Sequence, residues 1–173
     1  YTTLGFRLFW VADHGLQRAI FRAYNDWLAE FCSYAPDRLV GLPLVSMYDI
    51  DEAILELRRT AKQGHRGAMI FLSPPKGYPS YTSTVYDPFW GLAAEAGVVV
   101  ATHAGNDGYD ALIQMWEPGG AESSIFRSPL RNVVTKNRAV SDFYATAICH
   151  KVFERFPDLR LASVENGASW IPD

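Results

Sequence analysis

Hydrophobic positions in the first half of the chain predict two amphipathic helices. Between Leu16 and Phe31 apolar residues recur at steps of three and four, so they lie on one helical stripe that we expect to face the core. The members of this stripe are Leu16, Ala19, Ile20, Ala23, Trp27, Leu28 and Phe31. A second helix is predicted to begin with Asp49 and Glu52 in capping-box spacing and to end at Gly64.

Short apolar runs predict strands. Gly67–Leu72 and Val98–Thr102 are apolar without alternation, which is typical of strands buried on both faces in a parallel sheet. Two further strands are predicted at Leu39–Val45 and Leu159–Val164. Pro43 lies inside the first of these and lacks an amide donor, so we expect a strand end or a bulge there.

The segments between the later strands predict two more helices. One begins with Asp87 as N-cap and Pro88 as first helical residue and stops at Gly97. The other carries Ala145, Ile148, Cys149, Val152, Phe153 and Phe156, and ends at Pro157.

Helices and strands therefore alternate, as in right-handed βαβ units of a parallel sheet. A closed (β/α)₈ barrel of the TIM type needs roughly 250 residues. The 173 residues and four predicted strands would supply about half of one. The expected fold class is α/β, either part of such a barrel, as one partial domain over residues 1–173, or a smaller open sheet.

Composition and charge narrow the function. The chain is 49% hydrophobic and 20% charged, which suits a globular domain, and its net charge of −3 includes no run of like charge. We therefore expect a small-molecule substrate rather than nucleic acid or a membrane, and a cytoplasmic location. Cys32 and Cys149 form no CxxC pair and are expected to be reduced packing residues in helices.

Two residues that carry chemistry follow predicted strands, where function gathers in parallel α/β folds. His103 comes directly after Val98–Thr102 and could bind a divalent metal, take a substrate proton, or seal the strand end by bonding a loop carbonyl. Glu165 follows Leu159–Val164 and could be a metal ligand, a general base, or a structural ion pair.

The other histidines and the long segment after His103 offer weaker candidates. His14 and His65 are expected at the surface, and His150 is expected to interact with a helix C-terminus. The segment from Ala104 to Ser141 could be a lid or substrate wall, or it could be loop packing; its aromatic residues include Tyr109, Trp116 and Phe126. Asp107 and Asp110 in it are expected in turns. The motifs GxSxG, GxxxxGK[ST], HExxH and GxGxxG are absent from the sequence.

Several segments together resemble a known family. They are YNDWLAEFCSYAPDRLVGLPLV, GHRGAMIFL, YDPFWGLAAEAGVVVATHAG and FERFPDLRLASVENGASWIP. They are similar to amidohydrolase-related proteins, the group that includes aminocarboxymuconate-semialdehyde decarboxylase and the hydroxybenzoate decarboxylases. The resemblance covers most of the chain except about residues 105–138.

The resemblance implies a (β/α)₈ barrel enzyme with one divalent metal, usually zinc. Of the metal ligands, this sequence matches only the fifth-strand histidine, as His103; the others would lie outside it. The family's decarboxylases have a histidine where this chain has Glu165, so we assign that carboxylate the catalytic proton transfer.

The expected function is hydrolysis or non-oxidative decarboxylation of a small carboxylated or aromatic substrate by the full-length protein, with this fragment inactive alone. A non-catalytic binding module is the alternative. If the chain ends here, unpaired strand edges predict a homo-oligomer.

Overall fold

Three parallel strands form the sheet: β1 (Gly67–Ile70), β2 (Val99–His103) and β3 (Arg160–Val164), in the order β1-β2-β3. The computed structural model describes residues 5–104, 109–117, 129–130, 138–168 and 170–171. β1 and β3 fall within the predicted segments, and β2 extends one residue beyond its predicted segment, to His103. The predicted parallel α/β arrangement is therefore confirmed.

The fourth predicted strand, Leu39–Val45, is wrong as a regular strand. It makes one isolated parallel bridge, between Leu44 and Met69. The Met69 amide donates to the Pro43 carbonyl at 2.7 Å and the Val45 amide donates to the Met69 carbonyl at 2.9 Å. Since Pro43 has no amide proton, the ladder cannot extend through it. The segment nevertheless lies along β1 and forms that edge of the sheet.

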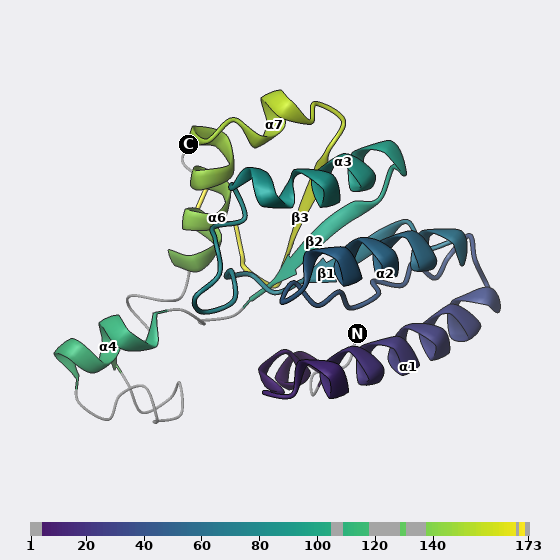
Figure 1. Cartoon of the computed structure of the whole chain (residues 1–173), viewed down its shortest axis with the longest axis horizontal. Helices are drawn as coiled ribbons and strands as arrows, with labels where there is room; N and C mark the ends of the chain where they lie inside the picture. The colour runs from purple at the N-terminus through teal and green to yellow at the C-terminus, as the bar shows by residue number, and fades with distance from the viewer. Residues whose placement is uncertain (1–4, 105–108, 118–128, 131–137, 169, 172–173) are drawn as a thin grey trace.

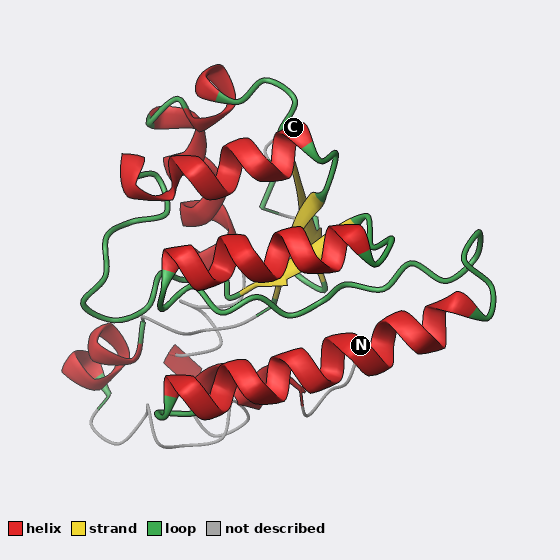
Figure 2. Ribbon diagram, turned by 45° about the vertical axis from the view of Figure 1, so that its right-hand side comes forward, coloured by secondary structure: helices red, strands yellow, loops and turns green. Residues whose placement is uncertain are grey.

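The first three α-helices lie in chain order along one side of the molecule, and the described helices have the following bounds. They are η1 (Gly5–Trp10), α1 (His14–Ser33), α2 (Ile50–Lys62), η2 (Thr84–Tyr86), α3 (Asp87–Glu95), α4 (Asp110–Trp116), α6 (Arg138–Cys149) and α7 (Val152–Arg155). Figure 1 shows α1, α2 and α3 as successive steps beside the strands, and Figure 2 shows the same three helices from a second side. No described helix combines the length and apolar character that crossing a membrane requires.

Helix α2 forms as its sequence predicts. The Asp49 side chain accepts hydrogen bonds from the amides of Asp51 and Glu52, at 3.1 Å each, and so caps the first turn. Leu57 is fully buried beneath the helix, and Gly64 takes φ +93° just after its end. That backbone conformation favours glycine because it has no Cβ.

The predicted core-facing stripe of α1 is wrong except at Leu28, which is buried. Leu16, Trp27 and Phe31 are each at least half exposed. The helix instead buries the neighbouring face, which consists of Gln17, Phe21, Asn25 and Leu28.

Two amide side chains explain the rotation of α1. Gln17 Nε2 donates to the carbonyls of Leu8 and Phe9. Asn25 Nδ2 donates to the Leu44 carbonyl at 2.9 Å, and Asn25 Oδ1 accepts from the Leu44 amide at 2.7 Å. Backbone groups buried at a sheet edge need partners, so the face that supplies them turns inward.

The last predicted helix is broken in two. α6 ends at Cys149, Lys151 takes φ 59°, and α7 begins at Val152. The left-handed residue redirects the chain so that Val152, 2% exposed, enters the core. Cys149 is exposed rather than a packing residue.

The start of α3 also differs from its prediction. Asp87 is the first helical residue rather than the N-cap, because η2 runs directly into α3. Its carboxylate lies 3.0 Å from the Arg155 guanidinium.

The sheet has two distinct faces because side chains alternate along each strand. The helix-covered face carries Ala68, Ile70, Val100 and Leu161 and packs against α2, α3, α6 and α7. The opposite face carries Met69, Ala101, Ala162 and Val164. Phe9 of η1 and Phe21 of α1 cover part of this opposite face, with ring centroids 4.8 Å apart.

Candidate functional site

The two residues predicted to carry chemistry meet at one end of the sheet. His103 is the last residue of β2, and Glu165 directly follows β3. The strands pair in parallel, with His103 opposite Val164, so both strands end at the same edge. His103 Nε2 lies 3.2 Å from Glu165 Oε2. The predicted position of each residue is therefore confirmed, and the structure adds their direct contact.

The pair belongs to the opposite face of the sheet. His103 has the same parity as Ala101, and its register partner Val164 packs with the cluster on that face. In a closed barrel this face lines the interior, since the helices cover the other one. The His103 side chain is 11% exposed and that of Glu165 is 53% exposed. The carboxylate is therefore accessible from solvent, whereas the imidazole lies mostly under its neighbours.

A backbone carbonyl determines where the imidazole carries its proton. His103 Nδ1 lies 3.0 Å from the Ala104 carbonyl oxygen. A carbonyl can only accept, so Nδ1 must donate the hydrogen bond. In the neutral ring, Nε2 then presents a lone pair toward the Glu165 carboxylate, and two acceptors face each other. A metal ion between Nε2 and Oε2 would turn this contact into a favourable one. The predicted carbonyl contact is thus present.

The turn after β3 holds Glu165 in an uncommon backbone conformation. Glu165 takes φ 57° and Gly167 takes φ 65°. Left-handed backbone is unfavourable for residues with a Cβ and often marks functional sites. Such a residue is held in place only by its surroundings.

Asn166 supplies that support, and our reading of the sequence missed it. Its side chain is buried, and Nδ2 donates to Ser163 Oγ at 2.9 Å and to the Val164 carbonyl at 3.1 Å. The Asn166-Gly167 pair, one residue after a predicted strand, was the available signal, because this dipeptide is typical of turns. Asn166 therefore positions the carboxylate of its neighbour.

The donors of this pair suit a divalent metal as part of a ligand set. Imidazole nitrogen and carboxylate oxygen bind zinc at about 2.0–2.1 Å, so two corners of a tetrahedral site lie roughly 3.3 Å apart. The 3.2 Å separation of Nε2 and Oε2 matches that distance. Among the described residues, no group of three or more His, Cys, Asp and Glu side chains could hold a metal ion. His103 and Glu165 therefore fit a metal but do not complete its coordination.

The other histidines take no part in this site. His65 was predicted at the surface, and that prediction is wrong: it is 7% exposed. Its ring lies so close to Gly41 that a Cβ on that glycine would come 2.9 Å from Cε1. His14 stacks on Tyr48 with ring centroids 3.6 Å apart. His150 is exposed at the end of α6.

The long segment after His103 is described only in part. Tyr109 donates a hydrogen bond to Asp142 on α6 at 2.5 Å, and Trp116 is 72% exposed. Asp107, Phe126 and the side chain of Asp110 lie outside the described residues. The choice between a lid and loop packing stays open.

Comparisons with known proteins identify the family of the chain. The family model described as amidohydrolase matches residues 6–173. No curated protein matches the chain. An amidohydrolase from Mycobacterium avium subsp. paratuberculosis K-10 is similar in structure, with TM-score 0.76 and 30% identity over 92% of this chain.

Two decarboxylase structures are similar in fold. The 2,6-dihydroxybenzoate decarboxylase from Rhizobium has TM-score 0.69 and 23% identity over 90% of this chain. The 5-carboxyvanillate decarboxylase from Sphingomonas paucimobilis has TM-score 0.61 and 22% identity over 84% of it. The chain spans only 40%, 47% and 40% of the three solved chains, respectively. The chain therefore belongs to the amidohydrolase family, and its α/β fold is part of a (β/α)₈ barrel.

Proposed function

We propose that the protein containing this chain is a metal-dependent enzyme that decarboxylates or hydrolyses a small carboxylated or aromatic substrate. The observation that carries the proposal is the pairing of His103 Nε2 with Glu165 Oε2, 3.2 Å apart at the carboxyl end of adjacent parallel strands. Family membership supports the general kind of enzyme. The fold shared with two aromatic-acid decarboxylases favours a substrate with a ring and a carboxylate.

His103 holds the metal in this proposal. The Ala104 carbonyl accepts from Nδ1, so Nε2, the ring nitrogen that faces Glu165, is the one that would bind the ion. A bound divalent ion, zinc in our proposal, supplies a Lewis acid that polarises the substrate or activates a water molecule. The remaining protein ligands come from parts of the protein outside the described residues.

Glu165 handles a proton in this proposal. Its side chain is half exposed beside the metal ligand, so it can reach both substrate and solvent. In decarboxylation the carboxyl group delivers a proton to the carbon that loses carbon dioxide. In hydrolysis the carboxylate takes a proton from the attacking water. Asn166 keeps the group aimed at His103 through its two hydrogen bonds.

The test is Glu165→Gln in the full-length protein, which retains the shape of the side chain but removes its proton transfer. Activity is measured as carbon dioxide release from a panel of aromatic acids and as hydrolysis of amides and esters. We expect kcat to fall by about 10²–10⁴-fold, while the metal content of the protein stays unchanged. Glu154→Gln on the exposed side of α7 is the control. An unchanged kcat in Glu165→Gln contradicts the proposed role, and loss of metal makes Glu165 a ligand instead.

A further inference from the structure

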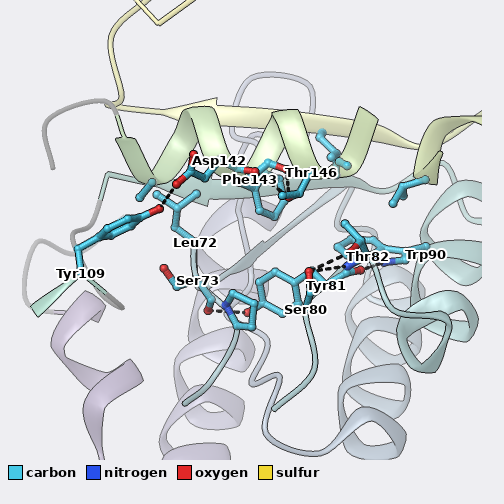
Figure 3. Close-up of a pocket in the computed structure, with 15 residues that line it drawn as sticks. Leu72, Ser73, Ser80, Tyr81, Thr82, Trp90, Tyr109, Asp142, Phe143 and Thr146 are labelled. Carbon is cyan, nitrogen blue, oxygen red and sulfur yellow. Dashed lines mark hydrogen bonds between the residues drawn. The ribbon is translucent and has the colours of Figure 1, made fainter. Parts of the chain in front are cut away.

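A cavity of about 170 Å³ lies within the helix-covered layer, away from His103 and Glu165. Figure 3 shows its walls: α6 lies on one side, and the loop after β1 with Tyr81, together with Trp90 of α3, lies on the other. Its apolar lining includes Leu72, Trp90, Phe143, Val152 and Leu161. Leu161 belongs to the helix-covered face of β3, whereas His103 belongs to the opposite face. The sheet therefore separates the cavity from the metal site.

The described residues that line this cavity come from several elements of the chain. They belong to β3, α3, α6, α7 and the loop over residues 72–82, with Tyr109 at the rim. The half of the barrel that this chain lacks would extend the sheet beyond its edges, not between these helices. The cavity is thus expected to persist in the full-length protein.

The volume of the cavity suits a ligand with a single ring. Cavities of about 150 Å³ with aliphatic and aromatic linings bind benzene. Pockets for drug-sized ligands start at about 300 Å³. At about 170 Å³, this cavity accommodates a single six-membered ring with one small substituent.

The polar rim favours a neutral hydroxyl group. Ser80 and Thr82 hydroxyls lie 3.0 Å apart at the rim, and Tyr109 donates to Asp142. Asp142 is the charged residue in the lining, and Arg138 Nε lies 2.8 and 3.0 Å from its two oxygens. Arg138 therefore compensates the charge of Asp142. No described lining residue carries a positive charge that would favour an anion.

Tyr109 keeps its own proton at this rim. Burial and the hydrogen bond to Asp142 raise the pKa of Tyr109 to about 12. The rim consequently presents hydroxyl groups at neutral pH rather than a phenolate.

We propose that this cavity is a second binding site, which takes a neutral single-ring aromatic alcohol or phenol. The ring packs among Trp90, Phe143 and Leu161, and the hydroxyl group joins the rim hydroxyls of Ser80 and Thr82. The site is independent of the proposed catalytic function, since it shares no residue with the metal site.

Phenol titrated into the full-length protein tests the proposal by calorimetry. We expect millimolar binding, as for other fragments of that size, and no binding of benzoate at this site. Ala147→Leu places three additional carbon atoms beside the cavity and should weaken phenol binding at least tenfold. Ala145→Leu, on the exposed side of the same helix, should leave it unchanged.

A measurement on the unaltered protein tests the proposal even if the Ala147→Leu variant does not fold. The indole N–H of Trp90, which donates to the Tyr81 carbonyl at 2.9 Å, should shift in the NMR spectrum when phenol is added. Its resonance is assigned by its loss in Trp90→Phe. Unaltered resonances, or equal binding by Ala147→Leu and the unaltered protein, overturn the proposal.

The variant His103→Ala distinguishes failure of this proposal from failure of the proposed metal site. Phenol binding that persists in His103→Ala places the ligand in this cavity whether or not the protein binds a metal. Binding that disappears in His103→Ala but survives in Ala147→Leu assigns phenol to the metal site and overturns the inference.

Discussion

The two faces of the sheet differ in how completely this chain covers them. Among the described residues, the cluster on the helix-covered face contains twenty buried hydrophobic residues, and that on the opposite face contains five. The helix-covered face is therefore a core that this chain largely builds itself. His103 and Glu165 lie on the other face, which, among the described helices, η1 and α1 cover in part.

The two faces therefore have different roles: residues on the helix-covered face stabilise the fold, and those on the opposite face are the candidates for catalysis. In a barrel, residues at the carboxyl ends of strands act in catalysis, while the packed layers hold the fold. The chain spans 40% of the amidohydrolase from Mycobacterium avium subsp. paratuberculosis K-10. The part present thus contains a section of the outer helical layer and a section of the barrel sheet. Substitutions on the two faces should have different consequences.

The largest effect is expected from Phe89→Ala on the helix-covered face. Phe89 is fully buried, so the free energy of unfolding should fall by about 3–5 kcal/mol, measured by urea denaturation of the full-length protein. His103→Ala should change it by about 1 kcal/mol or less. Equal losses from the two variants contradict the separation.

Asn25 and Asn166 bind backbone groups at opposite edges of the sheet, so their variants compare the two regions further. Asn25→Ala removes bonds to Leu44 and Glu56, and should lower the free energy of unfolding by about 1–3 kcal/mol. Its kcat should not change. Asn166→Ala should cost about 1 kcal/mol and also lower kcat, because it releases the turn that positions Glu165. An unchanged kcat in Asn166→Ala refutes its positioning role.

A smaller effect of opposite sign is expected from Glu165→Gly. The residue takes φ 57°, so glycine should raise the free energy of unfolding by about 0.5–1 kcal/mol while activity is lost. Gly167→Ala is the matched variant. A Cβ at Gly167 would meet nothing within 4 Å, so its expected loss of about 1 kcal/mol is conformational. A destabilised Glu165→Gly argues against backbone strain at the site.

The smallest effect concerns His65 at the other end of the sheet. Burial lowers the pKa of His65, and Arg59 adds to this, although the Gly41 carbonyl opposes it. The unfolded chain therefore takes up the proton more readily than the folded one. Stability should be complete above pH of about 6.5 and decline as the pH falls below it.

Urea titrations between pH 7 and pH 5 measure this dependence. His65→Leu should flatten it, and His150→Leu, at an exposed position, should not. A slope that persists in His65→Leu assigns the dependence to other groups.

Periodicity and caps predicted the parts of the fold that local chemistry determines. Asp49 caps α2 as expected, and the apolar runs at β1 and β2 are strands. The family resemblance, and the place of His103 and Glu165 at strand ends, were also available from the sequence. Parallel pairing then brings these two residues into contact.

Other features depend on partners distant in the chain. The orientation of α1 could not be predicted, because Asn25 bonds the backbone of Leu44 and this outweighs the apolar stripe. The break at Lys151 depends on Val152 packing against the core. His65 follows a turn typical of surface residues, yet Gly41 leaves space for its ring. The contact between His103 and Glu165 required the strand register, which no single segment specifies.

Metal content tests the central claim most directly. Elemental analysis of the full-length protein should find about one zinc or similar divalent ion per chain. That ion should be lost in His103→Ala and retained in His150→Ala. Equal metal content in all three proteins contradicts the assignment of His103 as a ligand. No metal in any of them contradicts the metalloenzyme proposal and favours a non-catalytic binding module.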